Sequence, residues 1–404
     1  MRFAFALIAA LLFGSAAANA GILDPRNWEA VLADAKGETI YFHAWGGEPR
    51  INDYIAWAAR AVEERFGVRV IHVKVSDTAE VVSRVLTEKA AGRMHGGGVD
   101  LVWINGENFA ALKREGLLYP APWSTELPNY RFVDVKDKSS VELDFTVPVE
   151  GREAPWGMAK LVFFYDSARL RDPPASAAAL ADWIAANPGR FTYPQPPDFI
   201  GTTFLKQLLV DLAPDAAALQ RPATDADFPT AAAPLFAWLD AANPNLWRQG
   251  RAFPRDYGSL RRLLADDEVD IAFAFNPADA SSAIANGELP DTVRSFVFDG
   301  GTLGNTHFVA IPFNTDAAAG AMVFANFLMS PEAQASKQDP DVWGDPTVLA
   351  VDRLSLEGRA RFDALDLGVA TLPPEKLGPT LPEPHPSWVA RIEHEWARRY
   401  GVVQ

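Results

Sequence analysis

The stretch Glu38–Ile51, ETIYFHAWGGEPRI, decides how the N-terminal half of the chain folds. Its first part, Thr39–Trp45, is rich in β-branched and aromatic residues and is typical of a strand buried on both faces. Gly46 and Gly47 end this strand, and Pro49 opens a helix whose apolar residues follow one face as far as Phe66. Residues 68–75 form the next strand. A strand, a glycine turn, a helix and a strand make a βαβ unit, so we expect the first two strands to be parallel.

Further α/β segments follow along the chain. A helix capped by Asp77, a strand over 99–104 and a short helix over 109–115 extend the first unit into a doubly wound parallel sheet. A second α/β region is predicted from strands at 160–165, 191–193, 269–275 and 307–311. The apolar helix at 317–329 is expected to pack back on the first region, and a helix at 388–400 closes the chain. The predicted organisation is a first lobe of residues 21–150 plus 312–404 and a second lobe of residues 151–311, with hinges at both ends of the second lobe.

Residues 1–20 are typical of a cleaved leader. Arg2 is followed by an apolar run, and Ala18-Asn19-Ala20 is a small-residue cleavage signal, so cleavage is expected near Ala20-Gly21 and the mature protein in the periplasm. A retained N-terminal anchor is the alternative. The chain has no cysteine, which excludes a lipid-modified cysteine, disulfides and thiolate metal ligands.

Charge and motifs argue against several functions. The net charge of −15 disfavours nucleic acid or an anionic membrane as a partner. The sequence contains no G-x-S-x-G motif, no phosphate-loop lysine, and no H-x-x-x-H spacing among its histidines. We therefore predict a protein that is not an enzyme and that uses neither a cofactor nor a metal.

Several segments, in order, resemble the extracellular solute-binding proteins of bacterial ABC importers. They are DLVWING (100–106), APWGMAKLVFFYDSARL (154–170), FDGGTLGNTHFVAIPFNT (298–315), MSPEAQ (329–334) and PEPHPSW (382–388). The similarity is greatest to the YnjB-type branch, near polyamine- and thiamine-binding relatives. It implies a type II periplasmic binding protein fold, in which two doubly wound α/β lobes joined by crossover strands hold a ligand in a cleft between them. It also implies a monomer that closes about its hinges and delivers its solute to a membrane permease and an ATPase.

Candidate ligand contacts follow from the rule that open α/β sheets bind ligands at the carboxyl ends of their strands. Further candidates lie on the two segments that cross between the lobes: the aromatic Trp156 on the first, and the polar Asn305 and Thr306 on the return strand. The resemblance implies that polyamine-binding relatives make ligand contacts near this return strand. Glu48 and Glu107 could equally well cap their own helices. Trp156 could equally well be a core residue. The predicted contacts are Trp45, Gly46, Gly47, Glu48, Asn105 and Glu107 in the first lobe, Tyr193, Thr202, Thr203 and Asn276 in the second, and Trp156, Asn305 and Thr306 at the crossovers.

The predicted function is capture of a small polar solute by hinge closure. One alternative is a secreted hydrolase or lyase with Glu48 and Glu107 as acid and base, and another is a sensory or chaperone module on the same fold. Acidic and aromatic candidates favour a polyamine- or thiamine-like cation. Glycines at helix starts favour an anion or a hydroxylated solute, so the identity of the solute stays open at this point.

Overall fold

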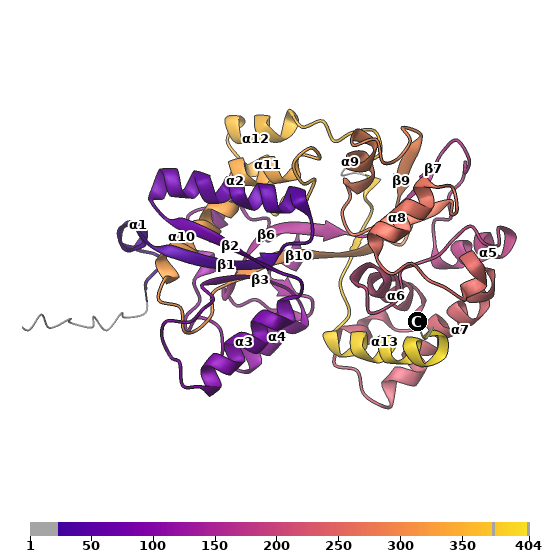
Figure 1. Cartoon of the computed structure of the whole chain (residues 1–404), viewed down its shortest axis with the longest axis horizontal. Helices are drawn as coiled ribbons and strands as arrows, with labels where there is room; N and C mark the ends of the chain where they lie inside the picture. The colour runs from indigo at the N-terminus through magenta and orange to yellow at the C-terminus, as the bar shows by residue number, and fades with distance from the viewer. Residues whose placement is uncertain (1–22, 374–375, 402–404) are drawn as a thin grey trace, which may run out of the picture.

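Two sheets, each with its own core, divide the protein into two α/β lobes that lie side by side (Figure 1). A computed structural model describes residues 23–373 and 376–401, so the predicted leader lies outside the described residues. In the first sheet the strand order is β11-β10-β3-β1-β2, with β6 also paired to β10. The second sheet has the order β8-β7-β9, and β4 and β5 form a separate hairpin. The strands are β1 (Thr39–Trp45), β2 (Arg69–Val75), β3 (Leu101–Ile104), β4 (Leu143–Asp144), β5 (Val147–Pro148), β6 (Glu153–Lys160), β7 (Val162–Asp166), β8 (Ile271–Ala274), β9 (Val293–Phe296), β10 (Thr302–Ala310) and β11 (Thr380–Leu381).

The helices surround the two sheets and separate into two sets. Those of the first lobe are α1 (Trp28–Ala35), α2 (Pro49–Phe66), α3 (Thr78–Ala90), α4 (Glu107–Arg114), α10 (Ala318–Leu328), α11 (Pro331–Gln338) and α12 (Leu356–Asp363). Those of the second lobe are α5 (Ala177–Ala186), α6 (Phe199–Leu212), α7 (Asp227–Ala242), α8 (Tyr257–Ala265), α9 (Asp279–Ala285) and α13 (Pro386–Tyr400). No helix in the described part of the chain is long and apolar enough to cross a membrane.

The opening βαβ unit is confirmed. β1 and β2 are parallel from the pair Thr39 and Arg69 to the pair Trp45 and Val75, and β3 is parallel to β1. The carboxyl ends of these three strands therefore meet at one edge of the first sheet. The predicted return of the apolar helix is also confirmed, because α10 packs in the core of the first lobe.

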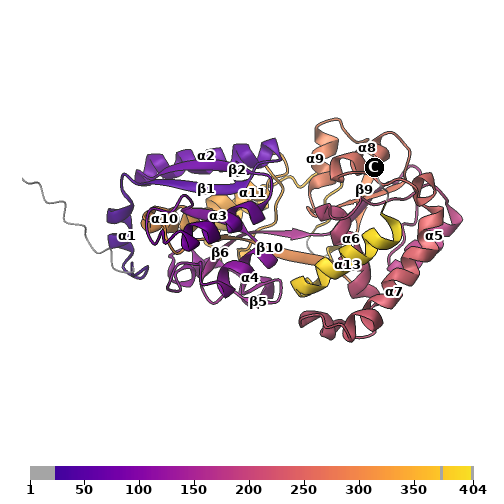
Figure 2. The same ribbon diagram turned by 60° about the horizontal axis from the view of Figure 1, so that its bottom comes forward.

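Two long strands carry the chain between the lobes. β6 and β10 pair antiparallel over residues 153–160 and 304–310, and they run from the first lobe toward the second (Figures 1 and 2). The single strand predicted at 160–165 is in fact the end of β6, the buried Leu161 and β7. Pro155 and Gly157 concealed the strand character of β6, because both residues are poor strand formers in isolation.

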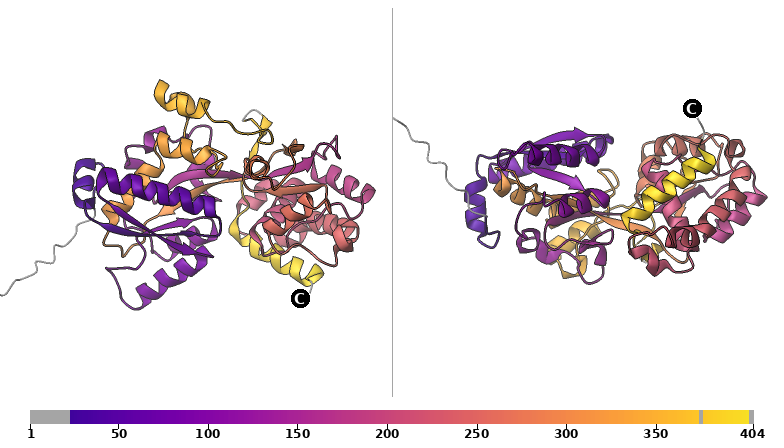
Figure 3. Two further views of the ribbon diagram at one scale, coloured as in Figure 1. Left: turned by 45° about the horizontal axis from the view of Figure 1, so that its top comes forward. Right: turned by 90° about the horizontal axis from the view of Figure 1, so that it is seen from below.

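The C-terminal helix corrects the predicted division of the chain. α13 was expected in the first lobe with the rest of 312–404, but Trp388, Ile392 and Trp396 are buried in the core of the second lobe. The indole of Trp396 donates a hydrogen bond to the hydroxyl of Tyr193 at 3.0 Å. Figure 3 shows α13, in yellow, against the second lobe in both views. The chain therefore crosses between the lobes three times, at β6, at β10 and in the segment that precedes α13.

Candidate functional site

A cleft of about 1020 Å³ lies between the lobes. The first lobe lines it with the loops after β1, β2 and β3, and the second lobe lines it with the starts of α6, α8 and α9 and one face of α13. β10 crosses its floor with Asn305 and His307. This volume is at the upper end of the range for small-molecule pockets, so the cleft fits a metabolite.

The end of β1 presents an aromatic side chain to the cleft. Trp45 is 41 % exposed, and its ring lies so close over Gly47 that a Cβ there would come within 2.4 Å of the indole. A side chain at position 47 would therefore force the ring of Trp45 to move. Glu48 accepts a hydrogen bond from the backbone N–H of Arg50, so it caps α2, as the structural alternative predicted, while it also lines the cleft.

The end of β3 is held in a fixed conformation by a buried carboxylate. Gly106 adopts a φ of +57°, which favours glycine, and its N–H donates to both carboxylate oxygens of Asp144 at 2.8 Å. On either side of this glycine, Asn105 donates to the carbonyl of Thr306, and Glu107 starts α4. The carboxylate of Glu107 makes no hydrogen bond or ion pair with the described residues, but it lies in the first turn of α4, where a negative charge favours the helix dipole, so the capping alternative stays open.

The second lobe contributes a helix start and a buried cation. Asp198 caps α6 by accepting from the N–H groups of Ile200 and Gly201. One turn further, the hydroxyl of Thr202 donates to Glu393 of α13 at 2.6 Å. Lys206 is buried in a 2.8 Å ion pair with Glu383.

The floor of the cleft is an aromatic and ionic cluster. Asp345 pairs with His307 at 3.0 Å and with the fully buried Lys337 at 2.5 Å. The ammonium group of Lys337 lies 4.5 Å from the ring centroids of both Trp156 and Trp343. Burial lowers the pKa of Lys337 to about 8, because desolvation outweighs the attraction of Asp345.

The lining is more acidic than basic. It includes eight Asp or Glu side chains against five Lys or Arg side chains. Burial raises the pKa of Asp279 to about 7, although Arg50 acts in the opposite direction. Among the described residues, no group of three His, Asp or Glu side chains is arranged to hold a metal ion.

Most of the predicted contacts line this one cleft. The sequence rule placed them at the carboxyl ends of strands, and the structure brings them together from both lobes. They are Trp45, Gly47, Glu48, Asn105, Glu107, Thr202, Asn276 and Asn305.

Five predicted contacts lie outside the lining. Gly46 packs against Lys74, and Trp156 is fully buried among Trp103, Trp343 and other rings of the first core. Thr306 is 1 % exposed and shares a hydrogen bond with Ser140. Thr203 is also buried and donates back to the carbonyl of Phe199 within α6.

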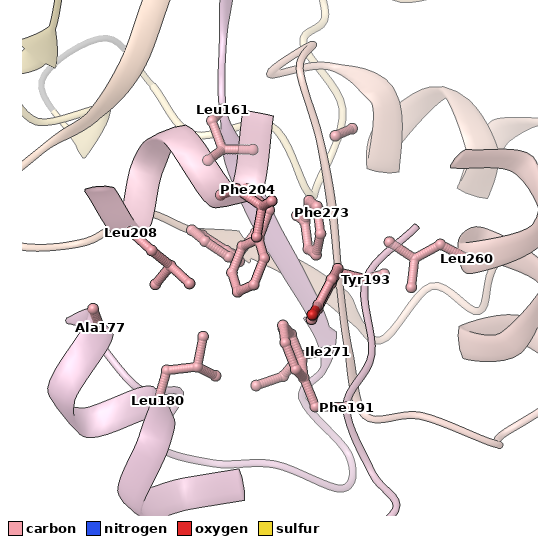
Figure 4. Close-up of a cluster of buried hydrophobic side chains, with 14 of the residues drawn as sticks. Leu161, Ala177, Leu180, Phe191, Tyr193, Phe204, Leu208, Leu260, Ile271 and Phe273 are labelled. Carbon is pink, nitrogen blue, oxygen red and sulfur yellow. The ribbon is translucent and has the colours of Figure 1, made fainter. Parts of the chain in front are cut away.

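Tyr193 is the fifth of these residues. Its ring lies in the core of the second lobe with Phe204 and Phe273 (Figure 4), and its hydroxyl donates to Asn243. Residues 191–193 form no ladder with a neighbouring strand, so the strand whose end was to present Tyr193 is absent from the described fold.

Other lining residues were not predicted. Phe199 is a 53 % exposed aromatic residue at a helix start, a signal that the sequence did contain. The sequence contains no comparable signal for four other lining residues, because their positions depend on how the C-terminal segment and the hinge strands cross. They are Lys206, His307, Trp343 and Glu393. These are tertiary placements that local patterns do not encode.

The fold and this cleft define a class of proteins. The chain belongs to the family of bacterial extracellular solute-binding proteins, whose model matches residues 57–349, which confirms the predicted resemblance. Protein YnjB of Escherichia coli (strain K12) is 44 % identical over 376 residues, which cover 93 % of this chain and 94 % of that protein.

Solved structures show the same fold at low sequence identity. The Tp0655 (TpPotD) lipoprotein of Treponema pallidum has a TM-score of 0.63 at 15 % identity, over 89 % of this chain and 98 % of that one. The periplasmic binding protein AfuA of Actinobacillus pleuropneumoniae, with fructose-6-phosphate bound, has a TM-score of 0.60 at 13 % identity, over 91 % and 99 %. A putative spermidine/putrescine ABC transporter protein of Listeria monocytogenes has a TM-score of 0.58 at 18 % identity, over 90 % and 99 %. The predicted fold class of two α/β lobes around a cleft is therefore confirmed.

Proposed function

We propose that this solute-binding protein captures a small polar solute between its lobes and serves an ABC import system in the periplasm. The observation that carries the proposal is the cleft of about 1020 Å³, lined from both lobes and floored by a strand that crosses between them. A ligand favours closure only through contacts that it makes to both lobes, and this cleft offers polar groups on both.

The partners follow from the class. The solute would pass from the closed protein to a membrane permease, with an ATPase supplying energy. One structural relative is named as a putative spermidine/putrescine ABC transporter, and another is described with fructose-6-phosphate bound, so an amine and a phosphorylated sugar are the two solute classes that we consider. Trp45, Asn105, Thr202 and Asn276 are the lining residues we propose as contacts to a solute of either class.

The test is to identify the natural solute. Protein purified from the periplasm is unfolded with acid, and the released small molecules are identified by mass spectrometry. We expect one solute in amounts comparable to the protein, and we expect less of it after Trp45→Ala. The purified solute is then incubated with the protein: recovery without conversion supports a receptor, whereas turnover would support the hydrolase or lyase that uses Glu48 and Glu107.

A further inference from the structure

At one end of the cleft, Glu107 has no hydrogen-bond or ion-pair partner among the described residues, Glu393 has only the neutral hydroxyl of Thr202, and Oδ1 of Asn305 accepts no hydrogen bond from them. We propose that Glu107, Glu393 and Asn305 form a subsite for a protonated amine of the solute, with one carboxylate supplied by each lobe. This inference rests on the proposed function and names the class of solute that the same cleft would take.

Glu393 faces the cleft from α13. Its carboxylate accepts a hydrogen bond from Thr202 and is only partly exposed. Burial raises the pKa of Glu393, and the negative charge of Glu107 also raises it, whereas the hydrogen bond from Thr202 and the charge of Lys206 act in the opposite direction. Two carboxylates that repel each other from opposite lobes are relieved by a cation placed between them.

Asn305 provides an observation of a different kind. This residue on β10 is 6 % exposed, lines the cleft, and donates from Nδ2 to Glu383 at 3.4 Å. Its Oδ1 is buried and accepts no hydrogen bond from the described residues. Buried acceptors in native proteins are rarely left unpaired, so this oxygen is available to accept from a donor on the ligand.

The nearby cation is already neutralised. Lys206 is held by Glu383 and lies between the rings of Phe145 and Phe199, at 5.3 and 5.6 Å from their centroids. Its ion-pair partner is therefore Glu383, although its charge also acts weakly on Glu393. Glu107 and Glu393 remain as two negative charges in excess at this end of the cleft.

The opposite end of the cleft is balanced. There Arg50 lies 3.7 Å from Glu48, and Arg261 lies 3.8 Å from Asp279. Glu48 and Asp279 therefore each have an arginine nearby, whereas Glu107 has no ion-pair partner among the described residues.

The chemistry of these groups selects an ammonium. Carboxylates and an amide oxygen are acceptors, and an ammonium group carries three N–H donors and no acceptor. Hydrogen bonds between an ammonium and a carboxylate are charge-assisted and stronger than neutral ones. A phosphate or carboxylate of the solute would instead meet two like charges here.

The experiment compares three probe classes. Wild-type protein is titrated by calorimetry with protonated amines (putrescine, spermidine and ethanolamine), with neutral 1,4-butanediol and with fructose 6-phosphate. The same titrations are made with Glu107→Gln, Glu393→Gln and, as a matched control outside the cleft, Glu64→Gln. We expect at least one amine to bind the wild type and the control alike, and each cleft variant to bind that amine about 10- to 100-fold more weakly.

Several results would overturn the proposal. Binding of the diol or the sugar phosphate without binding of any amine would remove the amine subsite and leave the receptor function standing. Equal amine affinity in wild type and both cleft variants would likewise refute the amine subsite and leave the receptor function standing. Failure of every amine to bind would also refute the subsite, whereas conversion of the natural solute to product would refute the receptor function itself. Glutamine keeps the acceptor that Thr202 needs, and thermal unfolding without probe verifies that each variant is folded.

Discussion

Two tryptophans of the first lobe illustrate how exposure separates a binding residue from a core residue. Trp45 is 41 % exposed at the cleft, and Trp156 is fully buried one layer below it. We expect Trp45→Ala to weaken binding of the natural solute about 10-fold while changing the free energy of unfolding by less than about 1 kcal/mol. Trp156→Ala should lower the free energy of unfolding by about 3 to 5 kcal/mol, because it leaves a cavity in the core.

Urea denaturation and calorimetric titration of both variants measure these effects. A large loss of stability in Trp45→Ala, or an unchanged affinity with normal stability, would contradict the assignment of Trp45 to the cleft.

Asp279 gives a prediction about pH. Its folded-state pKa, raised to about 7 by burial, lies above that of an unfolded aspartate, so the folded state binds the proton more tightly. The contribution of this group to stability is therefore present below about pH 4 and is lost as the pH rises toward about 7. An asparagine side chain would mimic the neutral form, so Asp279→Asn should gain stability relative to wild type as the pH rises.

The measurement is the free energy of unfolding of wild type and Asp279→Asn at pH 5 and pH 8. The difference between the two proteins should favour the variant more at pH 8. An identical difference at both pH values would show that the carboxyl group of Asp279 titrates as it does in the unfolded chain.

At the scale of single residues, the sequence predicts where the site lies in the chain better than it predicts which side chains there face the cleft and which are buried. The positions that follow β1 and β3 could be predicted because the carboxyl ends of parallel strands share one edge. Whether a side chain there faces the cleft depends on neighbours distant in sequence. Thr202 and Thr203 are adjacent on α6, yet only Thr202 lines the cleft, because the other hydroxyl turns back to its own helix.

The C-terminal helix is the element that most affects the second lobe. Trp396 of α13 is fully buried and contacts the rings of Tyr193 and Phe253. Trp396→Ala should therefore lower the free energy of unfolding by about 3 to 5 kcal/mol. Arg398→Ala, on the exposed face of the same helix, should change it by less than about 0.5 kcal/mol.

Chemical denaturation of the two variants compares the two faces of α13. Similar small effects at both positions would mean that the helix does not belong to the core of the second lobe.

The helices could be predicted from the sequence more reliably than the lobe against which each of them packs. The pattern of apolar residues placed the helix after Gly47 and its end at Phe66, and α2 spans Pro49–Phe66. The same kind of pattern predicted α13, but an apolar face shows only that a helix is buried and not against which lobe. This is why the helix was assigned to the first lobe and is found on the second.

The whole molecule consists of two lobes beside a cleft, and the proposed capture of a solute requires these lobes to move relative to one another. Contacts between the lobes near the hinge join α9 and the loop after β8 to the loop after α11, where Ser282 donates to the carbonyl of Pro340 at 2.8 Å and Asn276 donates to that of Trp343 at 3.2 Å. Lys206 of the second lobe also lies over the ring of Phe145 of the first lobe, and the lobes are connected by β6, by β10 and by the segment before α13. Rotation about these strands would bring the groups on both sides of the cleft onto a solute.

The central claim is that a solute closes the cleft, and a distance between the lobes tests it most directly. Because the chain has no cysteine, Ser83→Cys on α3 and Ala237→Cys on α7 place one spin label on each lobe without competing sites. Pulsed electron paramagnetic resonance then gives the distance between the labels with and without the co-purified solute. Our account predicts a shorter and narrower distance distribution when the solute is bound. A distribution that stays the same at saturating solute would contradict capture by closure.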